Sequence, residues 1–272
     1  ASSISAKLVG WYAFWNGLLR MKRSLISYPK SLSARVWRVG GVLRRVRIVL
    51  DDAAFLVARR RGGWSYLTLI SHTKLSPYPH MRVREKRTLV VDVTKNDDEL
   101  LASFSDTCRN EIRRTFRDDA LRFSVGIDDM RLVMRLYRAF RKDKELPVHG
   151  KSYFDGSLMF RAYLSGKLVS VVTAYPGTTA RVQHIFSVAA LDKETKNRIA
   201  YASRRLLYEC MKYTRDHGSV SVDLAGINVT RSEKAGITAF KRSFGGSEMP
   251  EYTYSIDSAF VRLFKRNSGK SS

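Results

Sequence analysis

Lys241 stands between two phenylalanines in the segment GITAFKRSFGG, residues 236–246. Phe240 and Phe244 are four residues apart, so they share one face of a short helix, where packing is their most common role. A lysine ammonium beside that face can neutralise a phosphate, or the oxyanion that develops during acyl transfer. The alternative is a surface lysine on a short helix, and the residue types alone leave both readings open.

Asp223 and His184 could each handle a proton. The segment SVSVDLAGIN, residues 219–228, is predicted to be a strand, and Asp223 precedes a glycine turn near its end. Because strand ends open on clefts in α/β sheets, this carboxylate could orient an amine or accept its proton, or it could cap the loop that follows. His184 lies in the predicted strand VQHIF, where it could act as a general base near neutral pH or have a structural role.

Arginines and tyrosines offer anion contacts and hydroxyl groups. Arg109, Arg113 and Arg114 share one helical pattern, and guanidinium groups suit phosphate oxygens. A second basic stripe consists of Arg131, Arg135, Arg138 and Lys142. Both groups could bind an anion or form solvated helix faces. Tyr252 and Tyr254 alternate on the last predicted strand, where one hydroxyl could act as a general acid and packing within a sheet is the alternative.

Several common active-site motifs do not occur in this sequence. It contains no P-loop, HExxH, CxxC or GxSxG pattern. The five histidines form no pair with metal-ligand spacing, so we expect no metal site. They are His72, His80, His149, His184 and His217. The two cysteines, Cys108 and Cys210, give no disulfide framework and suit a reducing compartment, so the sequence predicts a cytoplasmic protein.

The charge balance is strongly basic. The 272 residues include 49 Lys and Arg against 25 Asp and Glu, a formal net charge of +24. Such an excess predicts a polyanionic partner: nucleic acid, acidic lipid or a phosphate-bearing substrate. Ten of the basic residues, and no acidic residue, lie in the first 50 positions.

The segment LVGWYAFWNGLLRMKR, residues 8–23, is apolar and tryptophan-rich and then abruptly basic. It is shorter than the run of about 20 apolar residues that spans a bilayer, and no cleavage site predicts a signal peptide. It suits an interfacial helix with its cations on anionic lipid, peripheral on the inner face of a membrane. A core-packing helix with a basic end is the alternative.

Hydrophobic periodicity predicts an α+β fold. Residues 47–70 are predicted to form strand, turn and strand, with Gly62 and Gly63 as the hairpin signal. Residues 95–118 are predicted to be helical, with Asp97 or Asp98 as the N-cap. The later elements are a helix over 128–145, hairpin strands over 158–175 and 180–188, a helix over 196–217 ended by Gly218, and strands over 219–228 and 251–257. This order favours a mixed, largely antiparallel sheet flanked by helices.

Three segments carry a resemblance to a known family. TLVVDVTKNDDELLASFSDTCRNEIRRTFRD resembles the start of the acyltransferase domain in FemAB-like proteins of the GNAT superfamily. SVDLAGIN resembles the strand of that family that ends in Asp and a glycine turn, and GITAFKRSFGG resembles its Phe-Lys segment. The matching residues are Arg109, Asn110, Ile112, Arg113, Asp223, Gly226, Asn228, Gly236, Phe240, Lys241, Phe244 and Gly245. The match runs in order over residues 88–257.

The resemblance implies a GNAT-like fold and transfer of an acyl or aminoacyl group to an amine of a sugar or peptide cell-envelope precursor. It also implies that the Phe-Lys pair lies beside donor and acceptor. From the resemblance together with the chemistry of the residues, we assign catalytic roles to Lys241, Asp223 and His184. We expect donor or cofactor contacts from Lys196, Arg198, Asn228 and Phe240, and substrate contacts from Arg109, Arg113 and Tyr252. Lys196 and Arg198 open a helix whose backbone N–H groups can bind a pyrophosphate.

The same resemblance leaves the donor open among acyl-CoA, an acyl carrier protein thioester and aminoacyl-tRNA, with no tightly bound cofactor expected. We divide the chain into a docking segment over 1–45, a β-rich subdomain over 46–95, a GNAT-like domain over 96–265 and a disordered tail over 266–272. The alternative function is a non-catalytic basic protein that binds nucleic acid or an anionic membrane surface.

Overall fold

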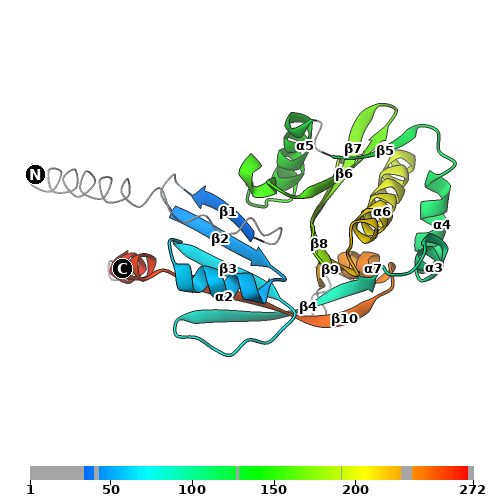
Figure 1. The fold of residues 1–272 in the computed structure, drawn as a ribbon. Coiled ribbons are helices and arrows are strands. Elements are labelled where there is room, and N and C mark those ends of the chain that lie inside the picture. The colour runs from blue at the N-terminus through cyan, green and yellow to red at the C-terminus, as the bar shows by residue number, and fades with distance from the viewer. Residues whose placement is uncertain (1–33, 40–42, 127–128, 191, 228–234, 269–272) are drawn as a thin grey trace, which may run out of the picture.

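The computed structural model describes residues 34–39, 43–126, 129–190, 192–227 and 235–268 of the chain (Figure 1). Ten strands form one sheet in the order β1-β2-β3-β10-β4-β9-β8-β7-β6-β5. The strands are β1 Ala34–Val39, β2 Leu43–Val49, β3 Tyr66–Ser71, β4 Met81–Asp92, β5 Leu121–Val125, β6 Leu158–Leu164, β7 Lys167–Tyr175, β8 Thr179–Ser187, β9 Ser221–Ile227 and β10 Ser247–Asp257. Only the pairs β2–β3 and β8–β9 are parallel. The predicted α+β class with a mixed, largely antiparallel sheet is therefore confirmed.

The segment between β2 and β3 is a helix, so the predicted strand, turn and strand over residues 47–70 was wrong. Helix α2, Asp52–Arg61, begins after Asp51, whose side chain accepts the N–H of Ala54. It ends at Gly62, with three arginines in its last turn. The helix carries the chain across the sheet, so β2 and β3 run parallel rather than as a hairpin.

Residues 95–118 form two helices rather than one. Helix α3, Asp97–Ala102, begins after Asn96, which forms a capping box with Glu99; the predicted N-cap at Asp97 or Asp98 is one or two residues too late. Helix α4, Asp106–Thr115, begins after Ser105, whose hydroxyl accepts the N–H of Cys108. Each helix has its own polar cap, which explains the break.

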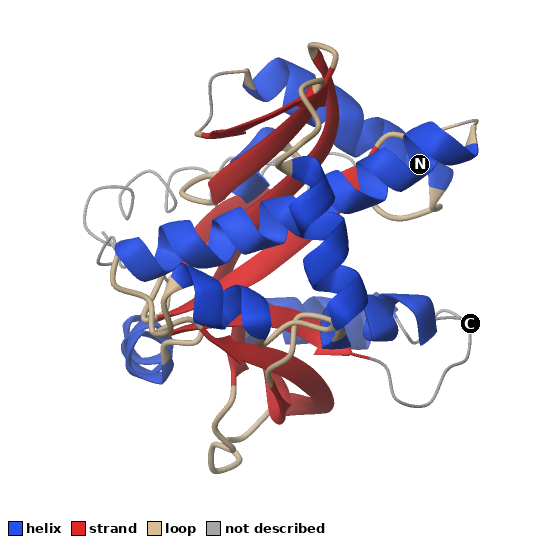
Figure 2. Ribbon diagram, turned by 90° about the vertical axis from the view of Figure 1, so that its right-hand side faces the viewer, coloured by secondary structure: helices blue, strands red, loops and turns tan. Residues whose placement is uncertain are grey.

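Of the remaining helices, those predicted over 128–145 and 196–217 are confirmed. Helix α5, Met130–Asp143, buries Val133 and Tyr137. Helix α6 spans Lys193–Asp216 and stops before Gly218, which has a φ of 89°. The short helices are the 3-10 turn η1 Lys151–Phe154, α7 Ala235–Arg242 and α8 Ala259–Ser268. Figure 2 shows the helices gathered against the strands.

Three apolar clusters hold these layers together. Successive residues on a strand face opposite sides of a sheet, and Val171 and Val172 of β7 accordingly enter two different clusters. Val172 packs in the cluster with helices α4 and α6, and Val171 packs in the cluster with α5 and η1. In the third cluster, Phe55 of α2 packs on β2, β3 and β10.

The predicted domain boundaries do not divide the sheet. Strand β10 pairs with β3 and β4, so the parts before and after residue 95 share one sheet. Strand β2 begins inside the predicted docking segment, at Leu43, and α8 continues through Ser268, beyond the predicted start of the tail. Residues 1–33 and 269–272 lie outside the described residues.

Candidate active site

Strands β8 and β9 run together for only three residue pairs. The pairs are Thr179 with Ser221, Ala180 with Val222 and Arg181 with Asp223. Beyond Arg181, β8 stays with β7, while β9 stays with β4. The two strands therefore separate at Arg181 and Asp223, and the charged side chains of the site gather at that point.

Asp223 is fully buried and accepts hydrogen bonds from four groups. Its Oδ1 accepts from the Thr88 hydroxyl and from the backbone N–H of Ala225, which is 2.7 Å away. Its Oδ2 accepts from Arg181 and lies 3.0 Å from Nε2 of His72. Burial acts to raise the pKa of Asp223, but Arg181, His72 and Thr88 outweigh burial and hold the pKa at about 2.

Arg181 joins Asp223 to a second buried carboxylate on β10. Its Nη2 donates to Oε2 of Glu251 over 2.7 Å, and Glu251 is fully buried. Lys86 of β4 lies 3.5 Å from the other carboxylate oxygen of Glu251. We call Arg181, Asp223, Glu251, Lys86 and His72 the ion network. Bringing these charges out of water is costly, and their mutual contacts offset that cost while holding each side chain in one orientation.

Lys241 points at the backbone of β9 just beyond the separation. Its Nζ donates to the carbonyl oxygens of Ala225 at 3.0 Å and Gly226 at 2.7 Å. Ala225 has a φ of 62°, a conformation held by Asp223 at its N–H and by Lys241 at its carbonyl. Burial, with a further contribution from Arg181, lowers the pKa of Lys241 to about 8. Two of the three N–H donors of the ammonium group serve these carbonyls.

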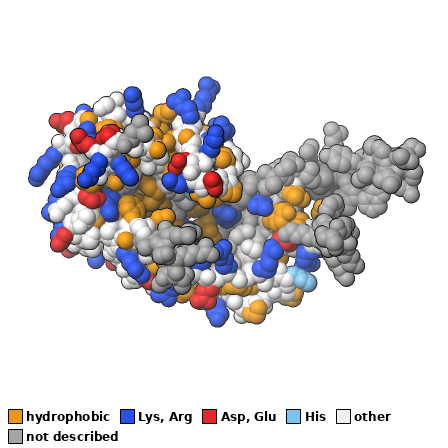
Figure 3. Space-filling model, turned by 180° about the vertical axis from the view of Figure 1, so that it is seen from behind, with side chains coloured by type: hydrophobic (Ala, Val, Ile, Leu, Met, Phe, Trp, Pro, Cys, Tyr) orange, Lys and Arg blue, Asp and Glu red, His pale blue; other side chains and the backbone are white. Residues whose placement is uncertain are grey.

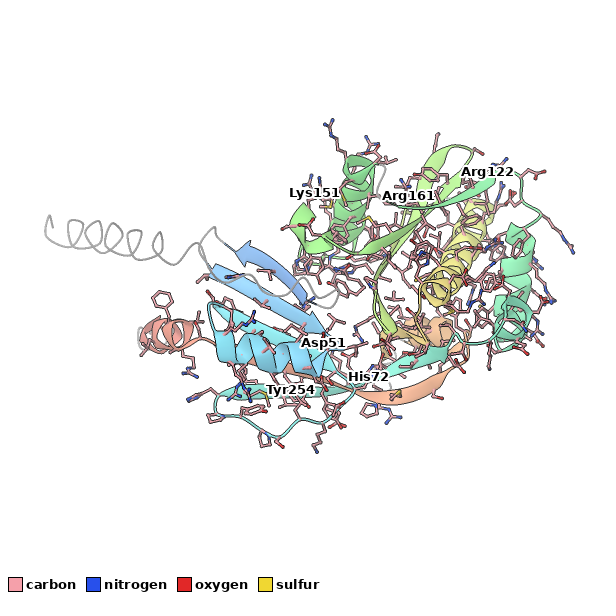
Figure 4. The ribbon with its side chains drawn as sticks, viewed as in Figure 1. Asp51, His72, Arg122, Lys151, Arg161 and Tyr254 are labelled. Carbon is pink, nitrogen blue, oxygen red and sulfur yellow. The ribbon has the colours of Figure 1, made fainter. Side chains whose placement is uncertain are left out.

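His72 directly follows β3, and Figure 4 labels it near the middle of the molecule. Its side chain retains 17% of its surface, whereas the side chains of Asp223 and Glu251 retain 0% and 1%. Among the described residues, Asp223 is its hydrogen-bond partner. His72 is therefore the member of the network around Asp223 that combines a titratable ring with access to solvent.

His184 lies in a separate aromatic cluster. Its ring centroid is 5.6 Å from that of Tyr137, 5.7 Å from Tyr153 and 5.9 Å from Phe154. Burial, assisted by Arg141, lowers the pKa of His184 to about 3, so the ring is neutral at pH 7. No hydrogen bond within the described residues joins it to Asp223 or Lys241.

The structure places the predicted donor contacts on the helices. Lys196 is exposed in the first turn of α6, and Arg198 is bound to both carboxylate oxygens of Asp118. Phe240 is half-buried on α7 beneath the Arg204 guanidinium, which lies 4.8 Å from its ring centroid. Asn228 lies outside the described residues.

The predicted substrate contacts lie on two other elements. Arg109 of α4 binds Asp106 and the carbonyl of Ala102, and Arg113 is exposed on the same helix. Tyr252 is buried on β10, with its ring 6.1 Å from that of Tyr254 in the cluster under α2. Of the predicted site residues, the structure thus brings Lys241 and Asp223 to one place, with contacts to the same two-residue stretch of β9.

Sequence reasoning missed five residues of this site: His72, Lys86, Thr88, Arg181 and Glu251. A signal was present at two of them. Arg181 stands between Ala180 and Val182 in an apolar strand, and Glu251 opens an aromatic strand. A charged residue inside such a pattern is buried only when it is paired. His72, Lys86 and Thr88 carried no comparable signal.

A cavity of about 520 Å³ lies away from the ion network. Leu50, Tyr175 and His217 are among its lining residues, and no member of the ion network is. We place the site by its converging charged groups rather than by this cavity, because catalysis needs positioned ionisable side chains. Within the described residues there is no group of three His, Cys, Asp or Glu side chains that could hold a metal ion.

Solved structures include proteins whose fold is similar to that of this chain. FemX superimposes with a TM-score of 0.58 over 85% of each chain, at 14% sequence identity. The fold is FemAB-like. This confirms the FemAB-like fold that the resemblance of the three sequence segments implied.

Two further structures are similar over most of their length. The C-terminal domain of a putative lysylphosphatidylglycerol synthetase from Agrobacterium fabrum matches with a TM-score of 0.49, 15% identity and coverage of 87% of this chain and 88% of that one. L-PGS from Bacillus licheniformis matches with a TM-score of 0.47, 13% identity and coverage of 86% and 84%. No protein-family model and no curated protein matches the sequence. No helix in the described part of the chain is long and apolar enough to cross a membrane.

Proposed function

We propose that this protein transfers an acyl or aminoacyl group to an amine of a sugar or peptide precursor of the cell envelope. One observation carries the proposal: in a FemAB-like fold, the Lys241 ammonium is held against β9 beside Asp223, where β8 and β9 separate. The Phe-Lys segment is the part of the sequence that the family resemblance placed next to donor and acceptor.

Acyl transfer to an amine requires few catalytic groups. The neutral amine attacks the carbonyl carbon of the donor, an oxyanion develops, and the thiolate or ribose oxygen leaves. Lys241 has a third N–H to offer to that oxyanion, because the other two serve the carbonyls of Ala225 and Gly226. Asp223 is a weak base with its pKa at about 2, so its role in this scheme is to position the groups bound to it.

The donor in this proposal is an acyl-CoA, an acyl carrier protein thioester or an aminoacyl-tRNA, and no tightly bound cofactor is required. The net charge of +24 supports a polyanionic donor or acceptor, or an anionic surface on the inner face of a membrane. Lys and Arg side chains are scattered over the face of the molecule in Figure 3. Docking through residues 1–50 remains a prediction, since residues 1–33 lie outside the described part.

The same charge favours a second candidate, a non-catalytic protein that binds nucleic acid or anionic lipid. Surface charge is sufficient for that function. It gives no reason to bury Arg181, Asp223 and Glu251 beside a buried lysine, because buried charges cost free energy without adding to surface attraction. The buried arrangement favours the enzyme.

Replacing Lys241 with methionine should lower turnover by about 100-fold or more, the usual cost of removing one donor to an oxyanion. Donors are first found by thermal shift with coenzyme A, acyl-CoAs, nucleotide-linked amino sugars and bulk tRNA. A ligand at about 100 times its dissociation constant adds roughly 2.7 kcal/mol to stability. Product formation is then followed by mass spectrometry.

Arg242→Met is the matched control, because Arg242 belongs to the same helix but pairs with Glu248 at half-exposed positions. It should keep wild-type turnover. Binding of RNA and liposomes should be equal in the two variants. Equal turnover in both variants contradicts the role of Lys241, and binding of RNA or liposomes without any transfer by the wild type supports the second candidate.

Turnover should also depend on pH through Lys241. Its pKa of about 8 means that the ammonium group loses its proton as pH rises through 8, so the oxyanion loses a cation and the rate should fall there. Lys241→Arg keeps its charge far above pH 8, so its pH–rate profile should lack that descending limb. If the rate falls at the same pH in the wild type and in Lys241→Arg, the fall is due to another group.

A further inference from the structure

The carboxylate of Asp223 dictates which nitrogen of His72 carries the proton. Its Oδ2 lies 3.0 Å from Nε2 of the imidazole ring. The pKa of Asp223 is held at about 2, so the carboxylate is ionised at pH 7 and can only accept a hydrogen bond. Neutral His72 must therefore carry its proton on Nε2, which leaves the lone pair of Nδ1 free to accept another proton.

The ion network holds this ring in one orientation. Asp223 cannot rotate away, because Thr88, Arg181 and the N–H of Ala225 also bind its two oxygens. Arg181 is itself fixed by Glu251. With 17% of its side-chain surface exposed, His72 is more accessible than Arg181 or Asp223, so a ligand can reach its ring.

From this geometry we propose that His72 is the general base of the transfer reaction and that Asp223 is its positioning residue. The inference rests on the proposed function and names the group that receives the proton from the amine. Nothing in the sequence pattern had singled out this histidine, which follows the last residue of β3.

The nitrogen lone pair of the amine forms a bond to the carbonyl carbon of the donor, the C=O electron pair moves onto oxygen, and the amine proton passes to Nδ1 of His72. The tetrahedral species then re-forms its C=O bond and breaks the C–S bond of a thioester or the C–O bond of an ester. The proton moves from His72 to the leaving sulfur or oxygen, which returns the ring to its neutral state.

The other candidates for this role are less suitable. His184 is surrounded by Tyr137, Tyr153 and Phe154, and its ring shares no hydrogen bond with the ion network among the described residues. The Asp223 carboxylate already accepts four hydrogen bonds and has no exposed surface. A histidine with an oriented carboxylate behind it is the arrangement that activates nucleophiles on many unrelated folds.

The test uses hydroxylamine as the acceptor, with acetyl-CoA, acetylated acyl carrier protein and bulk aminoacyl-tRNA as alternative donors. It measures the hydroxamate formed by the full chain above the uncatalysed background. His72→Gln retains an N–H donor for Asp223 but has no basic nitrogen. It should lower the rate by about 100- to 10,000-fold, the range of general base catalysis. His80→Asn is the control, because His80 is exposed in the same segment and its φ of 63° suits asparagine. It should leave the rate unchanged.

Chemical rescue of activity distinguishes a catalytic role of His72 from a merely structural one. Added imidazole should restore turnover to His72→Ala in a saturable way and should not affect His72→Gln, whose side chain fills the space. Nitrogen NMR of labelled histidine, assigned with His72→Gln, should show the Nε2–H form of His72 in the wild type and lose that preference in Asp223→Asn.

Either of two results overturns the role of His72 while leaving acyl transfer intact. In the first, the His72→Gln variant forms hydroxamate at a rate within twofold of an active wild type. In the second, NMR shows that neutral His72 carries its proton on Nδ1. Absence of enzymatic hydroxamate from the wild type with all three donors is a different result. It contradicts the proposed function itself, and the role of His72 falls with it.

Discussion

Arg181→Met should lower the free energy of unfolding by about 3–5 kcal/mol, the usual effect of removing one partner from a buried ion pair. Arg181 is 6% exposed, and its guanidinium contacts both Asp223 and Glu251. Methionine has a similar length but no charge, so the variant leaves two carboxylates buried next to each other. Urea unfolding at pH 7, followed by circular dichroism, measures the loss.

Arg82→Met is the matched control for Arg181→Met. Arg82 also pairs with a carboxylate across the sheet, that of Asp257, but 65% of its side-chain surface is exposed. Surface pairs contribute about 0–1 kcal/mol, so this variant should unfold nearly as the wild type does. Adding Asp223→Asn and Glu251→Gln to Arg181→Met should recover part of the loss, because neither position then carries a buried carboxylate without its arginine partner. A similar loss in Arg181→Met and Arg82→Met contradicts the picture of a buried network.

Gly246→Ala should cost about 3 kcal/mol, from backbone strain and steric overlap together. Gly246 has a φ of 90°, and a Cβ atom there comes within 2.5 Å of the carbonyl oxygen of Val90 and 3.1 Å of Cγ2 of Val91. Both contacts are on β4, which pairs with β10 from the next residue onward. Neither the carbonyl nor the strand can move without disturbing the sheet. The same urea titration measures the effect.

Gly218→Ala isolates the contribution of strain. Gly218 has nearly the same φ, 89°, but a Cβ atom there meets nothing within 4 Å. The expected cost is about 1 kcal/mol, from the left-handed conformation alone. If Gly218→Ala and Gly246→Ala lower the free energy of unfolding equally, β4 shifts to accommodate the extra methyl group at position 246. The close approach to β4 then does not explain why glycine occupies that position.

Much of the fold could be predicted from local patterns. The long helix ending before Gly218 and the hairpin over residues 158–175 both depend on residues that are close in sequence, and both were predicted correctly. Helix α2 was missed because the apolar run AFLVA suits a strand as well as a helix. The cap at Asp51 and the three arginines of its last turn were the better guide.

The site could be predicted only in part. Lys241 and Asp223 lie within segments that resemble a family, so the sequence pointed to them. Arg181, Glu251 and His72 come from β8, β10 and the end of β3, and no local pattern states which strands are neighbours. Arg181 was a recognisable irregularity in an apolar strand, but its two carboxylate partners are 42 and 70 residues away in the chain.

The position of β10 between β3 and β4 affects how this protein can be made. Synthesis proceeds from the N-terminus, so β3 and β4 leave the ribosome before the strand that joins them exists. At about 5–20 residues per second, the roughly 165 residues between the ends of β4 and β10 take on the order of 10–30 s to add. During that time the facing edges of β3 and β4 carry unpaired N–H and C=O groups, which are open to pairing with other chains. The nascent chain therefore depends on protection of these edges until its last strand arrives, and Glu251 then completes the ion network as the sheet closes.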